Sequence, residues 1–296
     1  CQVYQKLTCG TYNSDVKMIG KVVIVTGSNT GIGYTTAEDL AKRGARVILA
    51  CRDPQKGKEA RDKIIQSTGN DNIVFKQLDL TSFQSVRIFA DDIMKTETKL
   101  HVLINNAGAG KLDNSLTGDN LPIEAQVNYF SPFLLTMLLL PLLKSSAPSR
   151  IVNVSSILHY CGTTDNLDKL AKNFLQHSRV YANTKLANVL FTKKLSEILR
   201  GTGVTANCLH PGAVNTDIFR NKPASVRFLL RLLFKNAVEG AQTSIYLAVD
   251  PALSDVTGKY FADCREKSPA KKAADDEAAN RLWELSENVI KEKKIS

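Results

Sequence analysis

Short apolar runs alternate along this chain with longer segments in which apolar residues recur every three or four positions. The runs predict buried strands and the longer segments predict amphipathic helices, an alternation typical of a parallel sheet with helices on both faces. The strands are expected at residues 21–27, 45–51, 72–80, 100–108, 150–156, 203–212 and 258–264. The helices are expected at residues 32–44, 53–69, 82–97 and 120–146, and around Tyr181. Nothing divides residues 21–296, so we expect one α/β domain.

The two ends of the chain depart from this alternation. Residues 1–20 are polar and aperiodic, which predicts an N-terminal tail. Because the chain begins with Cys1 rather than Met, we expect a segment to precede it, with or without a membrane anchor. Residues 275–293 have an amphipathic pattern, which predicts a C-terminal helix that covers the domain. The longest apolar run, residues 133–143, contains a proline and is too short to span a bilayer.

Composition narrows the classes of function. The 296 residues have a formal net charge of +10, which suits nucleic acid, an anionic membrane or a phosphate-bearing small molecule. The sequence has no aromatic RNA-binding motif, zinc motif or helix-turn-helix pattern, so we expect no nucleic acid partner. Its six cysteines form no C-x-x-C pair and no cluster with histidine, which predicts free thiols and no metal site.

A glycine-rich stretch, TGSNTGIG (26–33), follows the first predicted strand and precedes a helix. At such a junction a dinucleotide pyrophosphate lies on backbone N–H groups and on the positive end of the helix, where a Cβ would prevent close approach. Glycines also make tight turns, but this position favours cofactor binding. The predicted cofactor contacts are Gly27, Ser28, Asn29, Thr30, Gly31, Ile32 and Gly33.

The end of the second strand bears on which cofactor binds. An NAD site usually offers a carboxylate to the ribose here, whereas this chain has Cys51 and Arg52. A neutral residue followed by an arginine leaves room and charge for a 2′-phosphate, which predicts NADP(H). The alternative is a solvated surface arginine. Asp53 comes next, and beside Pro54 it is expected to cap the following helix.

The third and fourth strands also end in candidate cofactor contacts. Asp79, followed by Leu80, could hold the adenine amino group. In NNAG (105–108), Asn105 could brace the sheet while Ala107 and Gly108 leave space for the cofactor. Taken singly, each of these could be ordinary loop composition.

A serine, a tyrosine and a lysine are the candidate catalytic residues. Ser155 and Ser156 end the fifth strand, and Tyr181 and Lys185 lie four positions apart on the next predicted helix, so they share one face. A nearby ammonium favours a phenolate, which suits acid–base catalysis. The Y-x-x-x-K spacing is common by chance, and its weight comes from its order after the serine and the glycine loop.

Together, the TG-x-x-x-G-I-G loop, NNAG, the strand-end serine, Y-x-x-x-K and the later HPG resemble the short-chain dehydrogenase/reductase family. Stretches such as INNAG, TKLANVLFT and TGKYFADC are similar to its membrane-associated, NADP-preferring retinol dehydrogenases. The resemblance implies a single Rossmann-type domain with a doubly wound, mostly parallel seven-stranded sheet in the order 3-2-1-4-5-6-7. It also implies NADP(H) as the cofactor.

The resemblance further implies roles for individual residues. Tyr181 would exchange a proton with the substrate oxygen, Ser156 would hydrogen-bond that oxygen, and Lys185 would act on Tyr181 and hold the nicotinamide ribose. Asn128 would support a water-mediated proton relay to Lys185, and His159 is expected beside the substrate. The nicotinamide side would be lined by Pro211, Gly212, Val214 and Thr216.

The same resemblance suggests a lipophilic alcohol or carbonyl as the substrate, with retinol or retinal as the best guess. Other lipid aldehydes, steroids or xenobiotic carbonyls are alternatives, as is a non-catalytic NADP(H)-binding sensor. A substrate lid is expected at about 216–240, and its segment 219–240 has a basic face that could contact a membrane surface or simply face solvent. We expect the endoplasmic reticulum membrane as the location, with mitochondrial or soluble cytoplasmic alternatives, and either a monomer or a homodimer.

Three positions depart from the family pattern. Thr30 stands where some NADP-dependent members carry a basic residue. NNAGAG lacks the bulky residues that often follow NNAG, and VNYFSP places Pro132 in the helix that carries Asn128. The last two changes bear on the substrate pocket.

Overall fold

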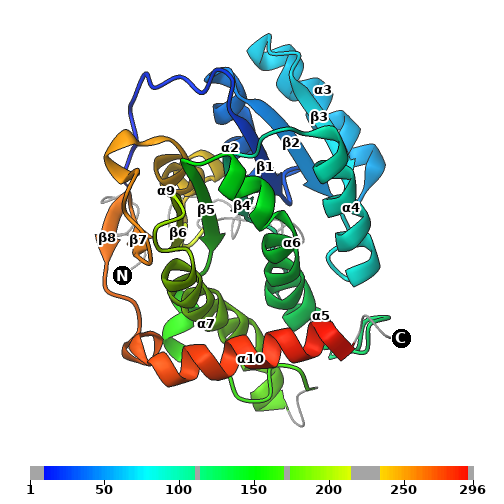
Figure 1. Ribbon diagram of the computed structural model, residues 1–296, viewed down its shortest axis with the longest axis vertical. Helices are drawn as coiled ribbons and strands as arrows, with labels where there is room; N and C mark the ends of the chain where they lie inside the picture. Colours follow the sequence, from blue (N-terminus) through cyan, green and yellow to red (C-terminus); the bar gives the residue numbers. More distant parts are fainter. Residues whose placement is uncertain (1–9, 111–113, 170–173, 215–233, 293–296) are drawn as a thin grey trace, which may run out of the picture.

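One sheet lies at the centre of the computed structural model (Figure 1), which describes residues 10–110, 114–169, 174–214 and 234–292. Its strands are β1 (Val22–Thr26), β2 (Arg46–Cys51), β3 (Ile73–Gln77), β4 (Val102–Asn105), β5 (Ser149–Val154), β6 (Val204–Leu209), β7 (Tyr260–Ala262) and β8 (Arg265–Lys267). They are ordered β3-β2-β1-β4-β5-β6-β7-β8, and all neighbours are parallel except β7 and β8. The predicted order of the first seven strands is confirmed. The prediction of seven strands missed β8, because its three residues are all exposed and show no apolar alternation.

Helices cover both faces of this sheet. The first face is covered by α2 (Gly31–Lys42), α3 (Pro54–Thr68) and α9 (Ala237–Val249). The other face is covered by α4 (Phe83–Thr96), α6 (Ser131–Ser145) and α7 (Phe174–Ile198), and α10 (Asp276–Glu292) packs across α7. Successive side chains of a strand point to opposite faces of the sheet, so Val23 and Val25 belong to one core and Ile24 to the other.

Local signals in the sequence set the helix boundaries. Asp53 Oδ1 accepts hydrogen bonds from the N–H groups of Gln55 (3.0 Å) and Lys56 (3.1 Å), so this carboxylate caps α3 as predicted. The same helix ends at Gly69, whose φ of 69° is the left-handed conformation that glycine adopts without strain.

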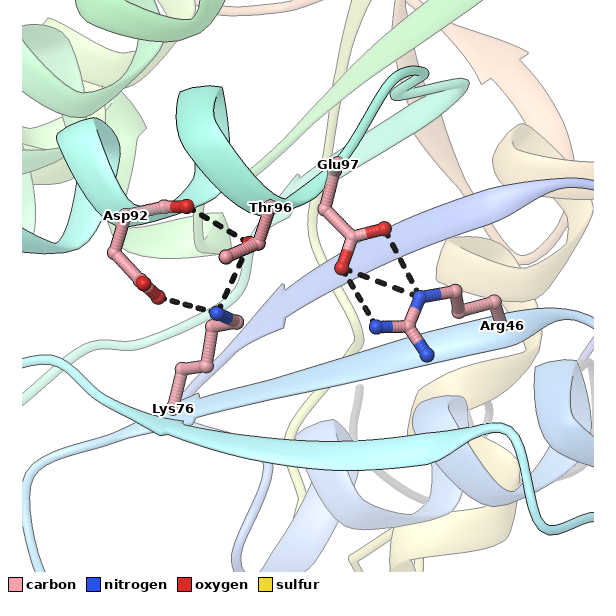
Figure 2. Close-up of polar contacts among 5 residues, drawn as sticks. All are labelled: Arg46, Lys76, Asp92, Thr96 and Glu97. Carbon is pink, nitrogen blue, oxygen red and sulfur yellow. Dashed lines mark hydrogen bonds and ion pairs between the residues drawn. The ribbon is translucent and has the colours of Figure 1, made fainter.

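Two sets of polar contacts fix α4 over the outer strands (Figure 2). Arg46, at the start of β2, makes a two-pronged ion pair with Glu97 just after α4, at 2.7 and 2.9 Å. Lys76 of β3 contacts Asp92 and donates to Thr96 Oγ1 at 3.1 Å, both on α4. The hydrogen bonds to Glu97 raise the pKa of Arg46. These contacts hold α4 against the start of β2 and against β3 near its end.

The segment before β1 lies against the domain. The Tyr12 ring packs on the Tyr246 ring of α9 at 5.3 Å between centroids, and the Arg43 guanidinium lies 5.6 Å from the Tyr12 ring centroid. Arg43 also donates to the carbonyl oxygens of Ser14 (2.7 Å) and Val16 (3.0 Å). Residues 10–20 form no regular helix or strand, yet they are docked on α2 and α9.

The most apolar helical stretch, Ile123–Ser145, is long enough to cross a membrane by length and composition. It joins α5 (Ile123–Ala125), a π-helical turn η1 (Gln126–Phe130) and α6. Of its most apolar window, 78% is buried inside the domain, where Phe133 and Leu135 are 2% and 0% exposed. In this fold it is a core helix.

Candidate active site

The candidate residues converge because the strands that carry them are parallel. The glycine loop follows β1, Arg52 follows β2, Asp79 follows β3, and NNAG includes the end of β4. The serines follow β5 and the HPG loop follows β6. The carboxyl ends of parallel strands meet at one edge of the sheet, where open α/β folds bind ligands.

Two loops brace each other at this edge. Asn106 Nδ2 donates to Thr26 O at 2.8 Å, and a Cβ on Gly27 would lie 2.9 Å from Ala107 Cα. A Cβ on Gly33 would lie 2.3 Å from Gly27 O, so Gly33 allows α2 to begin directly against the loop. Gly27 and Gly33 thus have packing reasons to be glycine, in addition to the predicted cofactor role.

The start of α2 fits an anionic group. Gly31 has a φ of +58° and open space where a Cβ would be. Thr30 makes no side-chain cap, and the first turn of α2 has no acidic residue, so its N–H groups and positive end are available. Ser28 Oγ is buried with no oxygen or nitrogen partner among the described residues, and it lies beside the buried Cys51 thiol, whose pKa burial raises to about 11. The residues present therefore fit a dinucleotide phosphate.

The flanking cofactor candidates have different surroundings. Arg52 is exposed, and its side chain makes no ion pair with a described residue. Asp79 Oδ1 accepts hydrogen bonds from the N–H (2.9 Å) and hydroxyl (2.8 Å) of Thr81, so one oxygen is already used in a turn. Leu80 packs into the core. Ile32 packs against Gly240 of α9, where a Cβ would lie 3.1 Å from Ile32 Cγ1. Both side chains therefore have packing roles. Asn29 is half-buried in the loop.

The two serines after β5 differ in their partners. Ser155 is buried, and its hydroxyl donates to the backbone oxygen of Lys185 at 2.6 Å, which ties α7 to the sheet edge. Ser156 is half-buried, and its hydroxyl accepts only a long hydrogen bond (3.3 Å) from the N–H of Leu158 in the 3₁₀ turn η2 (Ile157–Cys161). Ser156 is therefore the serine that can turn to a ligand.

Tyr181 and Lys185 lie together on α7, as their spacing predicts. The Lys185 ammonium is 5.4 Å from the centroid of the Tyr181 ring. Lys185 is 2% exposed, and its ammonium donates to Val154 O, at the end of β5, at 2.9 Å. The ammonium is thereby held beside the phenol at the sheet edge.

Asn128 clamps the loop after β4. Its Nδ2 donates to Ala109 O at 2.7 Å, and the N–H of Ala109 donates to Asn128 Oδ1 at 2.8 Å. The loop then passes over the candidate catalytic pair: a Cβ on Gly108 would lie 3.1 Å from Lys185 Nζ, and a Cβ on Gly110 would lie 3.0 Å from Cδ2 of Tyr181. A side chain at either position would displace Lys185 or Tyr181 by a few tenths of an ångström.

Pro132 gives a physical reason for the unusual helix around Asn128. Proline has no N–H, so the Asn128 carbonyl four residues earlier lacks its normal helical donor. Asn188 Nδ2 of α7 donates to that carbonyl instead, at 3.2 Å. Asn128 lies in the π-helical turn η1, a local geometry frequent at functional sites.

A buried polar network continues beneath the site. Asn105 Nδ2 donates to Asn153 Oδ1 at 2.8 Å and to Thr136 Oγ1 at 3.0 Å. Asn153 donates to Thr192 Oγ1 (2.9 Å), which in turn donates to Asn188 O (2.7 Å). Asn105 is 5% exposed, its amide nitrogen is used in this network, and its Oδ1 has no hydrogen-bond partner among the described residues. It braces β4 against β5, as the sequence suggested, and its contact with the cofactor stays a prediction.

The loop after β6 is compact. The N–H of Gly212 donates to His210 Nδ1 at 2.9 Å, and burial lowers the pKa of His210 to about 4, so the ring is neutral at neutral pH. Pro211, Gly212 and Val214 are half-buried. Thr216 and most of the predicted lid, up to residue 233, lie outside the described residues.

His159 does not occupy the predicted place in the substrate pocket. Its ring is 0% exposed, the N–H of Ala270 donates to Nε2 at 3.0 Å, and Nδ1 then donates to Ser156 O at 2.8 Å. Burial lowers the pKa of His159, which agrees with a neutral ring. The prediction was wrong, because this histidine anchors the segment before α10 to the end of β5.

Other expectations concerned metals and thiols. Among residues 10–110, 114–169, 174–214 and 234–292, no three His, Cys, Asp or Glu side chains are grouped to hold a metal ion. The described cysteines Cys51, Cys161, Cys208 and Cys264 are free thiols.

The sequence reading missed several residues of the site. Thr184 Oγ1 accepts from Asn128 Nδ2 at 3.2 Å, and Asn188 holds the Asn128 carbonyl. Both lie on the same face of α7 as Tyr181 and Lys185, so helical spacing could have identified them. Gly110 gave no comparable signal, because its constraint comes from a ring that is distant in sequence.

Comparison with known proteins identifies the family to which this chain belongs. The family model described as short chain dehydrogenase matches residues 21–226. Retinol dehydrogenase 12 of Homo sapiens is 43% identical, covering 94% of this chain and 88% of its own. Dehydrogenase/reductase SDR family member 13 of Bos taurus is 46% identical, covering 90% and 72%. A 3-oxoacyl (acyl-carrier-protein) reductase of Agrobacterium tumefaciens, solved with NADP bound, superposes with a TM-score of 0.68 at 25% identity, covering 83% and 93%. The chain therefore belongs to the short chain dehydrogenase family of oxidoreductases.

Proposed function

We propose that this protein is an NADP(H)-dependent oxidoreductase that interconverts a lipophilic alcohol and its carbonyl compound, with retinol and retinal as the leading pair. The observation that carries the proposal is the placement of Tyr181 beside the buried ammonium of Lys185, at the sheet edge where Ser156 and the open start of α2 also lie. The names of the retinol dehydrogenase relatives support the choice of substrate.

The residues of this edge have complementary roles in the proposed reaction. Ser156 donates a hydrogen bond to the substrate oxygen and orients it. Tyr181 gives that oxygen a proton during reduction and removes it during oxidation. Lys185 stabilises the phenolate electrostatically. Asn128 holds the loop over this pair through Ala109. The nicotinamide, when bound, supplies or accepts the hydride.

Cofactor preference is assigned to Arg52. Its exposed guanidinium follows β2, and Asp53 is already used in capping α3, so the nearest charge available to a ribose substituent is positive. An arginine fork suits a phosphate group. A reductase of the same fold that was solved with NADP supports this assignment.

Arg52→Asp is expected to weaken NADPH binding by about tenfold, because a charge-assisted contact is lost and a like charge replaces it. NADH affinity should rise or stay constant. The two dissociation constants can be measured by quenching of protein fluorescence. Arg61→Asp, on the exposed side of α3 next to Asp62, makes the same charge change elsewhere and should leave both constants unaltered. An unchanged NADPH/NADH ratio in Arg52→Asp would remove Arg52 from the assignment.

The surface next to Ser156 is apolar, which suits a lipophilic substrate. The turn η2 exposes three large apolar side chains: Ile157 is 40%, Leu158 47% and Tyr160 44% exposed. Apolar groups gathered beside reactive polar atoms are typical of a small-molecule site. Membrane contact through the basic face of residues 219–240 stays a prediction from helical spacing, but Lys235, which that spacing placed on the face with Arg227 and Arg231, is buried and paired with Asp263. Residence at the endoplasmic reticulum stays a prediction from the resemblance.

The substrate assignment is tested by measuring oxidation of NADPH with all-trans-retinal, beside aliphatic aldehydes and ketosteroids and with NADH as control. We expect retinal to be turned over with the highest kcat/KM. Turnover of the other carbonyls without retinal would keep the mechanism and discard the retinoid substrate. Tight NADPH binding with no turnover of any of them would contradict the proposed reaction and favour a binding protein.

A further inference from the structure

A buried lysine lies outside the catalytic residues, behind the loop that follows β6. Lys235 is 3% exposed, and its ammonium makes an ion pair with Asp263, which is 20% exposed on its side chain. Removing an ammonium from water is strongly unfavourable unless the charge is paired. A lysine that only made the surface soluble would not need this burial, so its contacts indicate its role.

Lys235 contacts the loop His210–Val214 through three of its parts. Its N–H donates to Ala213 O at 2.8 Å, and it forms a parallel bridge with Val214. Its side chain lies against Gly212, where a Cβ would come within 2.8 Å of Cδ and 2.9 Å of Cε. Gly212 has a φ of +89°, so this residue is glycine both for its backbone conformation and for the lysine packed on it.

Asp263 is held firmly enough to anchor this lysine. It is the first residue of the two-residue turn between β7 and β8, and it and Cys264 have φ values of 52° and 56°. Positive φ at both positions is typical of a type I′ hairpin, which Asp tolerates. The N–H of Cys264 donates to Thr243 Oγ1 of α9 at 3.2 Å. Gly10 packs so closely that a Cβ on it would lie 2.0 Å from Asp263 O. The turn is therefore in contact with both α9 and the N-terminal segment.

The loop and the turn are also connected through the sheet. Leu209, the last residue of β6, pairs with Phe261 of β7, and the N–H of His210 donates to Phe261 O at 3.0 Å. The loop is therefore fixed at its start by β7 and along its length by Lys235, which is itself attached to the end of the same strand. This arrangement leaves the Gly212 region little freedom to change shape.

We propose that the Lys235–Asp263 pair is a positioning pair that keeps His210–Val214 in the shape that receives the nicotinamide half of the cofactor. The inference rests on the proposed function and on the expectation, from the family resemblance, that Pro211, Gly212 and Val214 line that half-site. Neither residue of the pair is given a contact with the substrate or the reacting atoms. Their contribution is preorganisation: without them, binding would have to order the loop and would be weaker.

The test compares two ligands on the same protein. NADPH occupies both halves of the proposed site, whereas adenosine 2′,5′-bisphosphate reaches only the adenine half near Arg52. Lys235→Met keeps the aliphatic chain and removes the charge. We expect it to raise the dissociation constant of NADPH by about tenfold while that of the bisphosphate stays within a factor of about two, both measured by titration calorimetry.

A matched control lies on the same hairpin. Lys259 pairs with Glu266 at 3.1 Å, but their side chains are 50% and 54% exposed, and such surface pairs contribute little. Lys259→Met should leave both dissociation constants and the melting temperature close to those of the wild type. Equal weakening of both ligands by Lys235→Met would reduce the pair to a general stabilising role and overturn the proposal.

A second variant separates positioning from stability. Lys235→Met leaves the partly buried Asp263 carboxylate without its partner, and Lys235→Met/Asp263→Asn removes that unpaired charge, so the double variant should recover melting temperature. NADPH affinity should remain low in the double variant, because the Lys235–Asp263 ion pair is still absent. Affinity that recovered together with stability would overturn the proposal. A wild-type protein that bound neither ligand would refute the proposed function itself, whereas normal NADPH binding by Lys235→Met would refute only the positioning role.

Discussion

Tyr181→Phe is expected to lower kcat by about 10³-fold while leaving the dissociation constant of NADPH unchanged. The substitution removes only the hydroxyl group, which we assign to proton transfer. The ring, which packs under Gly110 and beside the Lys185 ammonium, is retained. Single-turnover oxidation of NADPH with the best substrate measures the chemical step, and fluorescence titration measures cofactor binding.

A second tyrosine close to the site provides the control. Tyr160 is 44% exposed, and its hydroxyl donates to Ser268 O at 2.6 Å. Tyr160→Phe keeps the ring that contributes to the apolar surface of η2 and loses only one exposed hydrogen bond, so it should retain kcat to within a factor of about three. Full turnover by Tyr181→Phe would mean that another group delivers the proton, and the mechanism proposed above would have to be abandoned.

Gly110→Ala is expected to lower kcat by about 10²-fold with a much smaller effect on NADPH affinity, because small misplacements of reacting groups reduce rates steeply. The added Cβ would lie 3.0 Å from Cδ2 and 3.4 Å from Cε2 of Tyr181. The loop cannot easily retreat, because both backbone polar groups of Ala109 are hydrogen-bonded to Asn128. The tyrosine ring must therefore move, and its hydroxyl moves with it. Steady-state kinetics and cofactor titration on the same preparation measure the two effects.

Gly118 offers the matching control on the same connection between β4 and α5. It is exposed, and nothing lies within 4 Å of the place where its Cβ would be. Gly118→Ala should leave kcat and cofactor affinity as they are. If Gly110→Ala behaved in the same way, the loop would be adaptable, and its contact with Tyr181 would have no catalytic importance.

The parts of the fold that the sequence predicted are those governed by local patterns. Buried apolar runs indicated β1 and β2, and Asp53 indicated the start of α3. Tyr181 and Lys185 were predicted to meet because four positions make about one helical turn. The strand-end loops were predicted to converge because parallel strands end on the same edge.

The contacts that were not predicted join elements that are distant in sequence. Nothing in the neighbourhood of Lys235 distinguishes a buried lysine from a solvated one, and its burial depends on a hairpin that begins after α9. Likewise, Gly110 is constrained by a ring on α7. Such constraints arise from tertiary packing, and spacing along one segment does not encode them.

The error at His159 has a related cause. Its position three residues after Ser156 suggested the pocket, but the 3₁₀ turn that begins there points the ring into the domain interior. There it bonds the N–H of Ala270, a residue 111 positions later. A histidine near a catalytic serine in the sequence is thus not necessarily near its substrate.

The buried asparagine network has a consequence for engineering this enzyme. Each amide in it has one workable orientation, because Asn105 donates to Asn153 and Asn153 donates to Thr192. Asn153→Asp would remove the N–H group that donates to Thr192 Oγ1. Even this isosteric substitution would therefore leave one hydrogen bond of the network unmade. Designs that change substrate choice should therefore vary the apolar side chains of η2 and leave the network residues of β4, β5 and the middle of α7 unchanged.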